Sequence, residues 1–246
     1  MEEFIKGMDL STLLEVEAHG GKFYDGGGAE DAVEILKRCG MNLVRLRLWN
    51  NPYSETGKPY GAGTNDLEKT LVMAKRLKKA QIPWLLDLHY SDFWADPGKQ
   101  NIPKAWQGLT VPELVQAVYA YTADVLCALL RQDAAPAMVA VGNELSNGML
   151  WPYGRVPEYR NLADFLSAGI RAVRECLPGV PVMLHLDNGG SNELYRRWFD
   201  HYLECGGADF EYIGLSYYPF WHGSLEDLRA NMHDIARRYG KDLIVA

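Results

Sequence analysis

Residues 137–147 read Ala-Met-Val-Ala-Val-Gly-Asn-Glu-Leu-Ser-Asn. The first five form a short, continuous apolar run, which is typical of a strand covered on both faces of a sheet. A glycine and an Asn-Glu pair follow directly, so the strand would deliver Asn143 and Glu144 to a loop at its carboxyl end. The segment therefore predicts a buried strand with a polar pair at its mouth.

The same pattern recurs along the chain. Apolar, β-rich runs predict strands at 4–8, 42–48, 84–88, 137–141, 181–186, 212–216 and 243–246. Helical patterns lie between them at 29–38, 66–79, 112–132, 162–175, 193–204 and 225–239. Gly40 is placed to cap the first helix, 64–66 is a start signal for the second, and Pro112 fits the first turn of the third. No linker rich in Pro, Gly or Ser interrupts the alternation, so we expect one domain over 1–246.

Two α/β architectures fit this alternation: a (β/α)8 TIM barrel truncated after the seventh strand, and a doubly wound open sheet. A barrel collects its functional residues at the carboxyl ends of many strands, whereas an open sheet concentrates them at its switch point. Six of the seven strands are followed by polar or aromatic residues: Asp9 and Ser11; Arg47, Trp49 and Asn50; His89, Tyr90, Asp92 and Trp94; Asn143 and Glu144; His185, Asp187 and Asn188; Tyr217, Tyr218, Trp221 and His222. This distribution favours the truncated barrel.

Composition excludes several classes of partner. With 246 residues, 48% of them hydrophobic, the chain can bury a large core. A formal net charge of -7 argues against nucleic acid, because no basic tract could neutralise phosphates. No apolar run reaches the roughly 18 residues of a membrane span. The start, Met-Glu-Glu-Phe-Ile-Lys, does not have the form of a signal peptide. We therefore expect a cytoplasmic protein, or a secreted one if a leader has been removed.

The four cysteines, Cys39, Cys127, Cys176 and Cys205, lie far apart in the sequence. They form neither a Cys-x-x-Cys pair nor a His-paired metal spacing. We expect buried thiols that behave as small hydrophobic side chains, with neither zinc nor a disulfide framework.

Glu144 is the strongest candidate for chemistry. Glycoside hydrolysis needs one carboxyl group to protonate the leaving oxygen and a second to attack the anomeric carbon or to activate water. Glu144 suits the first role, although an acid at a helix start would look the same. Asn143 would bind a sugar hydroxyl beside the cleaved bond, or shape the turn. The second carboxylate should emerge from a later strand, and residues 242–246 are such a strand, ending at the last residue. We expect the chain to carry half of an active site.

Arg45 interrupts an otherwise apolar strand, 42–48. A guanidinium inside a barrel must be paired, and carboxylates of the active site are the expected partners, with a structural ion pair as the alternative. Arg47 shares the same face of the strand by parity, so the sequence leaves the assignment between the two arginines open.

Residues 87–98 gather acids, a histidine and aromatic rings into one loop. His89 and Asp92 lack the tight spacing of metal ligands, so we predict no metal. A sugar platform fits better, because Trp94, like Trp221 further on, offers an apolar face for a pyranose ring unless it belongs to the core. Gly26 to Gly28 lack a phosphate-binding spacing and are expected to form a flexible loop.

Six segments together resemble the endo-β-1,4-galactanases of glycoside hydrolase family 53, and the resemblance covers the whole chain in order. The segments are Lys6-Gly7-Met8-Asp9-Leu10-Ser11, Val44 to Trp49, Asp87-Leu88-His89-Tyr90-Ser91-Asp92-Phe93-Trp94-Ala95-Asp96-Pro97, Val141 to Glu144, His185 to Gly189, and Ile213 to Gly223. The resemblance implies a retaining (β/α)8-barrel hydrolase of the β-1,4-galactan in type I arabinogalactan and pectin, without a cofactor. The substrates would be β-1,4-galactan or galacto-oligosaccharides; the oligomeric state stays open.

The resemblance also implies roles for single residues. Glu144 matches the acid/base, Asn143 its hydroxyl-binding partner, and Arg45 the arginine near the nucleophile; Tyr217 or Tyr218 would orient that nucleophile. The nucleophile itself is expected just after Ala246, so the chain as given is expected to lack full activity. Calcium sites of the family on later loops are not carried over. The residues expected to bind substrate are Asp9, Trp49, Asp87, His89, Asp92, Trp94, His185, Asn188, Trp221 and His222.

Two rival functions remain at this point. One is another retaining barrel glycosidase of the mannanase or cellulase type, which would share the Asn-Glu strand end. The other is a galactan-binding protein without catalysis, which would keep the aromatic residues and lose the chemistry.

Overall fold

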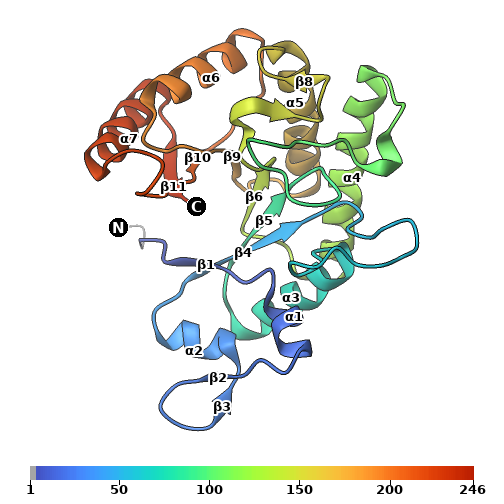
Figure 1. Cartoon of the computed structure of the whole chain (residues 1–246), viewed down its shortest axis with the longest axis vertical. Coiled ribbons are helices and arrows are strands. Elements are labelled where there is room, and N and C mark those ends of the chain that lie inside the picture. The colour runs from blue at the N-terminus through green and yellow to red at the C-terminus, as the bar shows by residue number, and fades with distance from the viewer. Residues whose placement is uncertain (1–3) are drawn as a thin grey trace.

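The computed structural model describes residues 4–246 and has one seven-stranded parallel sheet. The strands follow one another in sequence order across the sheet, which curves into part of a barrel (Figure 1). They are β1 (Gly7–Asp9), β4 (Leu43–Leu48), β5 (Trp84–Leu88), β6 (Met138–Val141), β9 (Val182–Leu186), β10 (Tyr212–Leu215) and β11 (Asp242–Val245). The predicted parallel strands are confirmed, with β5 at the predicted bounds.

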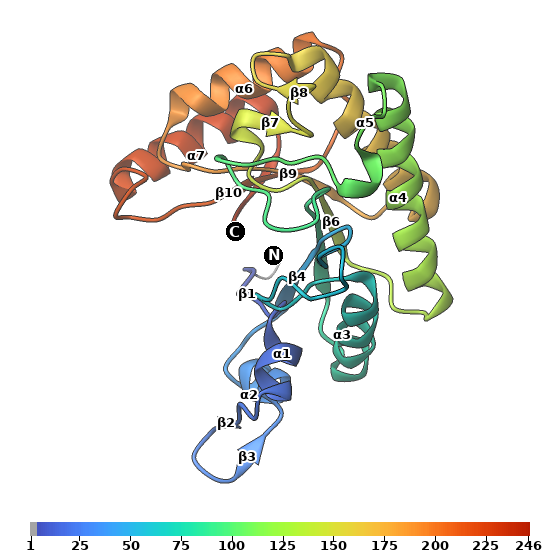
Figure 2. The same cartoon turned by 45° about the vertical axis from the view of Figure 1, so that its right-hand side comes forward.

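The helices lie on the outer side of the curved sheet, as Figure 2 shows for α3 to α7. They are α1 (Leu13–Ala18), α2 (Ala32–Arg38), α3 (Leu67–Ala80), α4 (Val111–Arg131), α5 (Tyr159–Cys176), α6 (Asn192–Glu204) and α7 (Leu225–Tyr239). The six predicted helices are all present. α2 begins three residues later than predicted, because Asp31 caps it by accepting a hydrogen bond from the Val33 N–H at 2.7 Å.

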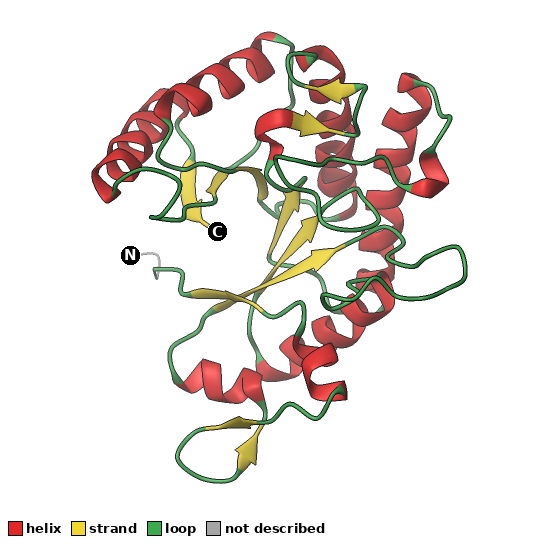
Figure 3. Ribbon diagram, in the orientation of Figure 1, coloured by secondary structure: helices red, strands yellow, loops and turns green. Residues whose placement is uncertain are grey.

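Short elements escaped the sequence analysis. Two antiparallel hairpins of two-residue strands lie outside the main sheet: β2 (Phe23–Tyr24) with β3 (Ala29–Glu30), and β7 (Gly148–Met149) with β8 (Gly154–Arg155) (Figure 3). Gly26 to Gly28 lie in the turn of the first hairpin. Two 3-10 helices, η1 (Lys104–Trp106) and η2 (Leu145–Asn147), complete the described chain. None of these elements is long enough to produce a periodic pattern.

The strand order decides between the two predicted architectures. A doubly wound sheet reverses its strand order at a switch point, whereas here every neighbouring pair in the sheet follows chain order. The fold is therefore a (β/α)8 barrel of which seven strands are present. In the part of the chain that the structure describes, β1 and β11 are the two edges of the sheet, and residues of both line a groove between them.

The barrel interior has an apolar layer below a polar one. The apolar layer consists of Leu43, Leu85, Met138, Ala140 and Met183, which pack on one another from four adjacent strands. Because side chains alternate between faces along a strand, the next inward positions towards the carboxyl ends belong to Arg45, Asp87 and His185. The main hydrophobic core lies on the other face, between the strands and the helices.

α4 requires a correction to the expectation that no apolar stretch reaches the length of a membrane span. With 21 residues, α4 is long and apolar enough to cross a membrane by length and composition alone. A core helix of a globular protein meets the same two criteria. In the structure, one face of α4 is buried, with Leu114, Val118, Val125 and Leu129 among its buried side chains, and it packs along α5. This is the position of an outer barrel helix.

The expectation of buried thiols is wrong. Cys39 and Cys127 are exposed, Cys176 and Cys205 are half-buried, and all four are free. Three of them lie at or next to helix C-termini and Cys127 lies within α4. An apolar residue at such a position is not required to face the sheet, so composition alone could not establish burial.

The first testable prediction concerns Asp66, which caps α3. Its carboxylate accepts a hydrogen bond from the Lys69 N–H at 2.8 Å and another from the hydroxyl of Tyr53 in the preceding loop. Asp66→Ala should therefore lower the free energy of unfolding by about 1–2 kcal/mol in urea titrations. Lys75→Ala, on the exposed side of the same helix, is the control and should change it by less than about 0.5 kcal/mol. Equal effects of the two variants would contradict the capping role.

Candidate active site

Glu144 lies where β6 ends and η2 begins. Its backbone is left-handed, with φ of 48° and ψ of 57°, a conformation that a residue with a side chain rarely adopts and that costs about 1–3 kcal/mol. Gly142 precedes it with φ of 88°, and a Cβ there would come within 2.6 Å of Leu145. Gln100, which is buried, donates from Nε2 to the carbonyl oxygens of Asn143 at 2.9 Å and Glu144 at 3.3 Å. The surrounding structure thus holds Glu144 in a strained, fixed position.

The Glu144 carboxyl group is largely removed from water. Burial raises its pKa above the ordinary value, and the negative charges of Asp187 and Asp96 act in the same direction. The positive charge of Arg45 acts in the opposite direction, as would a hydrogen bond donated by Ser216 to the ionised carboxylate, but the net shift is upward. Ser216 Oγ lies 2.6 Å from Glu144 Oε1. A carboxyl group with a raised pKa retains its proton closer to neutral pH, which is what a general acid requires.

Arg45 forms the central ion pair of the polar layer. Its Nη2 lies 2.6 Å from Asp87 Oδ2 and donates at 2.8 Å to Asn143 Oδ1, while Nε donates at 3.0 Å to Asp87. Burial alone would raise the pKa of Asp87, but the charge of Arg45 holds it well below its usual range. Asp9 adds a weaker contact with Arg45 at 3.7 Å. The open assignment is therefore resolved: Arg45, and not Arg47, contacts the residues beside Glu144.

His185 connects Asn143 with Ser216. Its Nδ1 lies 2.9 Å from Asn143 Oδ1, and its Nε2 lies 2.9 Å from Ser216 Oγ. Complete burial lowers the pKa of His185 to about 3, with the nearby charge of Arg45 adding to the effect, so the ring is neutral. Gly214 makes room for it, because a Cβ at that position would come within 3.1 Å of the ring.

His89 and Trp49 support the polar layer from behind. His89 Nε2 lies 3.2 Å from Asp87 Oδ2, while His89 Nδ1 accepts hydrogen bonds from Trp49 Nε1 at 3.3 Å and from the Ala95 N–H at 3.1 Å. Since both donors point at Nδ1, a neutral His89 carries its proton on Nε2 and donates to Asp87. Asp87 is thereby held between Arg45 and His89.

Four residues predicted to bind substrate directly do not face the solvent. Trp49, Asp87 and His185 have no exposed surface and His89 is 1% exposed, so direct contact with a sugar is ruled out in this structure. Their roles are to pack and to hydrogen-bond behind Glu144 and Asn143. Asp92 is half-buried, and its two carboxylate oxygens accept the backbone N–H groups of Asn51 at 3.0 Å and Lys104 at 2.8 Å, so its predicted contact with substrate stays a prediction.

The aromatic candidates differ in exposure. Trp94 is half-buried, and the guanidinium of Arg47 lies 4.1 Å from its ring centre. Trp221 is 75% exposed in the loop after β10 and has its ring edge-on to that of Tyr218. Both rings therefore keep surface on which a sugar could stack, and their predicted role stays a prediction.

The remaining candidates surround the strand ends. Asp9 is partly exposed beside both arginines, with its carboxylate 3.5 Å from Arg47 Nε. Asn188 is half-buried and left-handed, with φ of 52°. Tyr217 donates its hydroxyl proton to the Gly223 carbonyl at 2.8 Å, and His222 Nδ1 lies 3.2 Å from both the Tyr218 N–H and the Ser216 carbonyl oxygen. The predicted substrate-binding and orienting roles of these residues stay predictions.

Three further residues belong to the site. Sequence analysis did not single out Ser216 or Gln100, and it placed Asp187 among the strand-end residues without assigning it a role. Ser216 directly follows β10 and shares the inward parity of Gly214, which is the one signal that could have revealed it. Gln100 lies in a loop, where no periodic pattern applies. In residues 4–246, His, Cys, Asp and Glu form no cluster of three or more suited to a metal ion.

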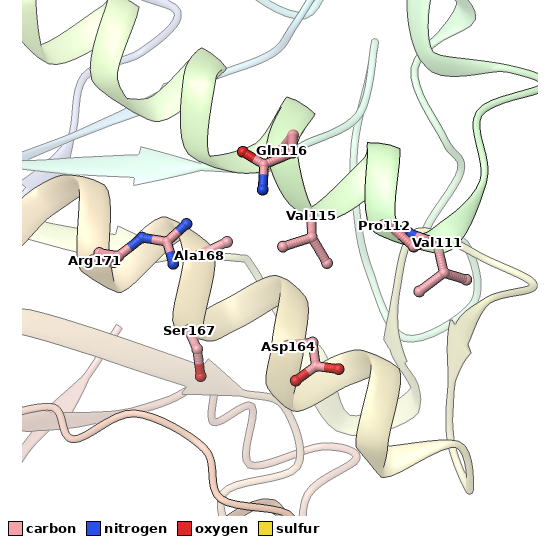
Figure 4. Close-up of a pocket in the computed structure, with 8 residues that line it drawn as sticks. All are labelled: Val111, Pro112, Val115, Gln116, Asp164, Ser167, Ala168 and Arg171. Atoms are coloured by element: carbon pink, nitrogen blue, oxygen red, sulfur yellow. The ribbon is translucent and has the colours of Figure 1, made fainter.

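A second depression lies on the outer surface between α4 and α5 (Figure 4). It is lined by Val111, Pro112, Val115, Gln116, Asp164, Ser167, Ala168 and Arg171. These residues lie on helices, whereas the titratable groups described above come from strand ends. The catalytic candidate is therefore the carboxyl end of the barrel.

A (β/α)8 barrel with a half-buried glutamate of raised pKa at the end of β6 is the arrangement expected of a barrel glycoside hydrolase. A family model for glycosyl hydrolase family 53 matches residues 5–246, and the chain belongs to this family. It is 37% identical to an endo-β-1,4-galactanase of Bacillus subtilis (strain 168), over 100% of this chain and 56% of that protein.

Two other relatives extend the comparison. An uncharacterized protein in the bgaB 5′ region of Niallia circulans is 46% identical, over 99% of this chain and 67% of that protein. The solved catalytic domain of the Ignisphaera aggregans family 53 protein is 41% identical, with a TM-score of 0.95 over 98% of this chain and 67% of that one. The chain thus spans between about half and two thirds of the length of these relatives.

The second prediction uses the depressed pKa of Asp87. A carboxyl group whose pKa is lowered on folding adds stability above its unfolded pKa of about 3.9, and this contribution is lost as pH falls below that value. Asp87→Asn should therefore lower the free energy of unfolding by about 3 kcal/mol at pH 7, and the difference from wild type should shrink at pH 3. Urea titrations at both pH values measure this. Asp133→Asn, at an exposed surface pair, should show little effect at either pH, and a pH-independent deficit in Asp87→Asn would contradict the ion pair.

Proposed function

We propose that the protein is a retaining endo-hydrolase of β-1,4-galactosidic bonds in type I arabinogalactan and pectic galactan. The observation that carries the chemistry is the Glu144 carboxyl group, fixed at the end of β6 and shifted upward in pKa by burial. The named relative from Bacillus subtilis, a β-1,4-galactanase, supports the choice of linkage and sugar.

In this proposal Glu144 acts twice. It first protonates the leaving glycosidic oxygen, and then, as a carboxylate, it removes a proton from the water that hydrolyses the glycosyl-enzyme intermediate. Asn143 cannot swing freely, because its side chain is held by Arg45, His185 and the Ala95 carbonyl. We expect the nucleophilic carboxylate to follow β11; the Ala246 N–H continues the pairing of that strand by donating to the Leu215 carbonyl at 2.9 Å.

The third prediction tests the acid role. In a full-length parent protein that continues past Ala246 and carries the nucleophile, Glu144→Ala should reduce turnover of galactan by roughly 10²–10⁴-fold, because the leaving oxygen then departs without a proton. An aryl β-galactoside with a good leaving group needs no such proton, so the release of its aryl group in the first turnover should be retained. Stopped-flow measurement of the released aryl group, beside reducing-end assays on galactan, makes the comparison. Glu68→Ala, at an exposed acid of α3, is the control, and equal loss on both substrates would remove Glu144 from the role.

The fourth prediction concerns the aromatic surface. Trp94→Ala and Trp221→Ala should each weaken galacto-oligosaccharide binding by roughly 1–3 kcal/mol if the rings stack on sugar, an estimate scaled from burial of a large side chain. Isothermal titration calorimetry would give the dissociation constants, with Tyr24→Ala on the distant β2–β3 hairpin as an exposed aromatic control. Unchanged binding together with a lower melting temperature would instead assign the two tryptophans to packing.

The same assays separate the rival functions. A mannanase or cellulase of the same class would turn over mannan or a β-glucan in preference to galactan. A galactan-binding protein without catalysis would show the affinity losses of the tryptophan variants and no turnover of either substrate. The substrate proposal therefore depends on preferential cleavage of purified β-1,4-galactan.

A further inference from the structure

A chain of hydrogen bonds leads from Arg45 to Glu144 through Asn143, His185 and Ser216. The orientation of the Asn143 amide determines which group donates and which accepts along this chain. The Asn143 Nδ2 group donates to the Ala95 carbonyl at 2.7 Å, and its Oδ1 accepts from Arg45 at 2.8 Å. A flipped amide would place NH₂ against a guanidinium, which has no acceptor, and oxygen against a carbonyl oxygen. Asn143 Oδ1 is therefore an acceptor in this site.

The orientation of Asn143 fixes the tautomer of His185. Because Oδ1 accepts, His185 Nδ1 at 2.9 Å must be the donor and carries the ring proton. A second proton is disfavoured, since burial and the charge of Arg45 lower the pKa of His185 to about 3. His185 Nε2 is consequently an unprotonated acceptor, and Ser216 Oγ lies 2.9 Å from it.

The Ser216 hydroxyl can donate one hydrogen bond, and two neighbouring atoms could accept it, His185 Nε2 and Glu144 Oε1. If the proton points to His185 Nε2, Ser216 Oγ can only accept from Glu144 Oε1 at 2.6 Å, and Glu144 must then be protonated on that oxygen. If the proton points to an ionised Glu144, two lone pairs face each other between Ser216 and His185. Since Ser216 and His185 are buried, water cannot easily satisfy the second arrangement.

We infer that Ser216 is a positioning residue which, oriented by His185, holds the proton of Glu144 on Oε1 and so stabilises the acid form. When that proton leaves for the glycosidic oxygen, the Ser216 hydroxyl turns from His185 Nε2 to Oε1 and keeps its own proton. The net change is one proton moved from Glu144 to the leaving oxygen. The catalytic meaning rests on the proposed function, whereas the direction of the hydrogen bonds does not.

The charged groups around Glu144 come from every neighbouring element. Arg45 of β4 contributes a positive charge; Asp187 at the end of β9 and Asp96 in the loop after β5 contribute negative ones, and the neutral phenol of Tyr195 on α6 faces the same region. These charges are present in wild type and in variants at Ser216 alike. A change in Glu144 titration on altering Ser216 or His185 therefore reports their hydrogen bonds.

The sign of that change tests the inference. In a protein labelled with ¹³C at glutamate carboxyl carbons, and with the Glu144 signal assigned by its loss in Glu144→Gln, NMR titration follows the Glu144 pKa directly. Ser216→Ala should lower it, because the acceptor that stabilises the protonated form is lost. His185→Leu should lower it too, because the freed Ser216 hydroxyl can then donate to the carboxylate. Thr122→Val, which removes a buried hydroxyl on α4 outside the site, should leave it unchanged.

The outcomes separate this inference from the substrate proposal. A raised Glu144 pKa in Ser216→Ala would show that Ser216 mainly donates to the carboxylate and would overturn the inference, as would an unchanged pKa in His185→Leu. Neither result requires turnover, so an absence of galactan hydrolysis in a full-length protein that carries the nucleophile would refute the proposed function alone. In an active protein, Ser216→Ala should also move the alkaline limb of the pH–rate profile to lower pH, since the acid then loses its proton earlier.

Discussion

The buried ion pair between Arg45 and Asp87 is the constraint on which the rest of the site depends. Asp87 has no exposed surface, and an unpaired carboxylate there would carry a large desolvation cost. Arg45 compensates that charge at 2.6 Å, and the two groups then determine the orientation of their neighbours. Arg45 fixes the amide of Asn143, and Asp87 fixes the proton of His89. Because both arrangements reach the mouth of the barrel, an ion pair whose carboxylate is fully buried sets the geometry of the groups around Glu144.

This arrangement of hydrogen bonds depends on the register in which neighbouring strands of the barrel pair. Arg45, Asp87 and His185 all occupy inward positions one step above the apolar layer, and a shift of one residue in any strand would turn its polar side chain into the hydrophobic core. The backbone is strained at the ends of the strands that carry this polar layer. Tyr90, Glu144 and Asn188 are left-handed where their strands end, with φ between 48° and 52°. Each would relax in an isolated segment, so their shared conformation indicates that packing around the strand ends overrides local preference.

The sequence predicted the architecture well, because short continuous apolar runs identify buried strands and helical periodicity identifies helical segments of ten residues or more. It also located Glu144 and Arg45, since a charged residue in or directly after a buried strand is conspicuous. It was wrong about Trp49, Asp87, His89 and His185 as substrate contacts, because parity shows which way a side chain points and not whether water reaches it. Ser216 escaped because a serine at a strand end is common, and its importance arises only from His185 on the neighbouring strand.

Two carboxyl groups at the barrel mouth have raised pKa values, Glu144 and Asp187, and their surroundings assign them different parts. Burial is the main cause for both. Asp187 Oδ1 is buried without a hydrogen-bond partner among the described residues, so Asp187 has no partner on that oxygen to direct a proton. Glu144 instead meets Ser216, which His185 orients in turn. Asp187 therefore acts on Glu144 through its charge, which opposes ionisation of the acid, while the chain from Arg45 to Ser216 determines where the proton of that acid resides.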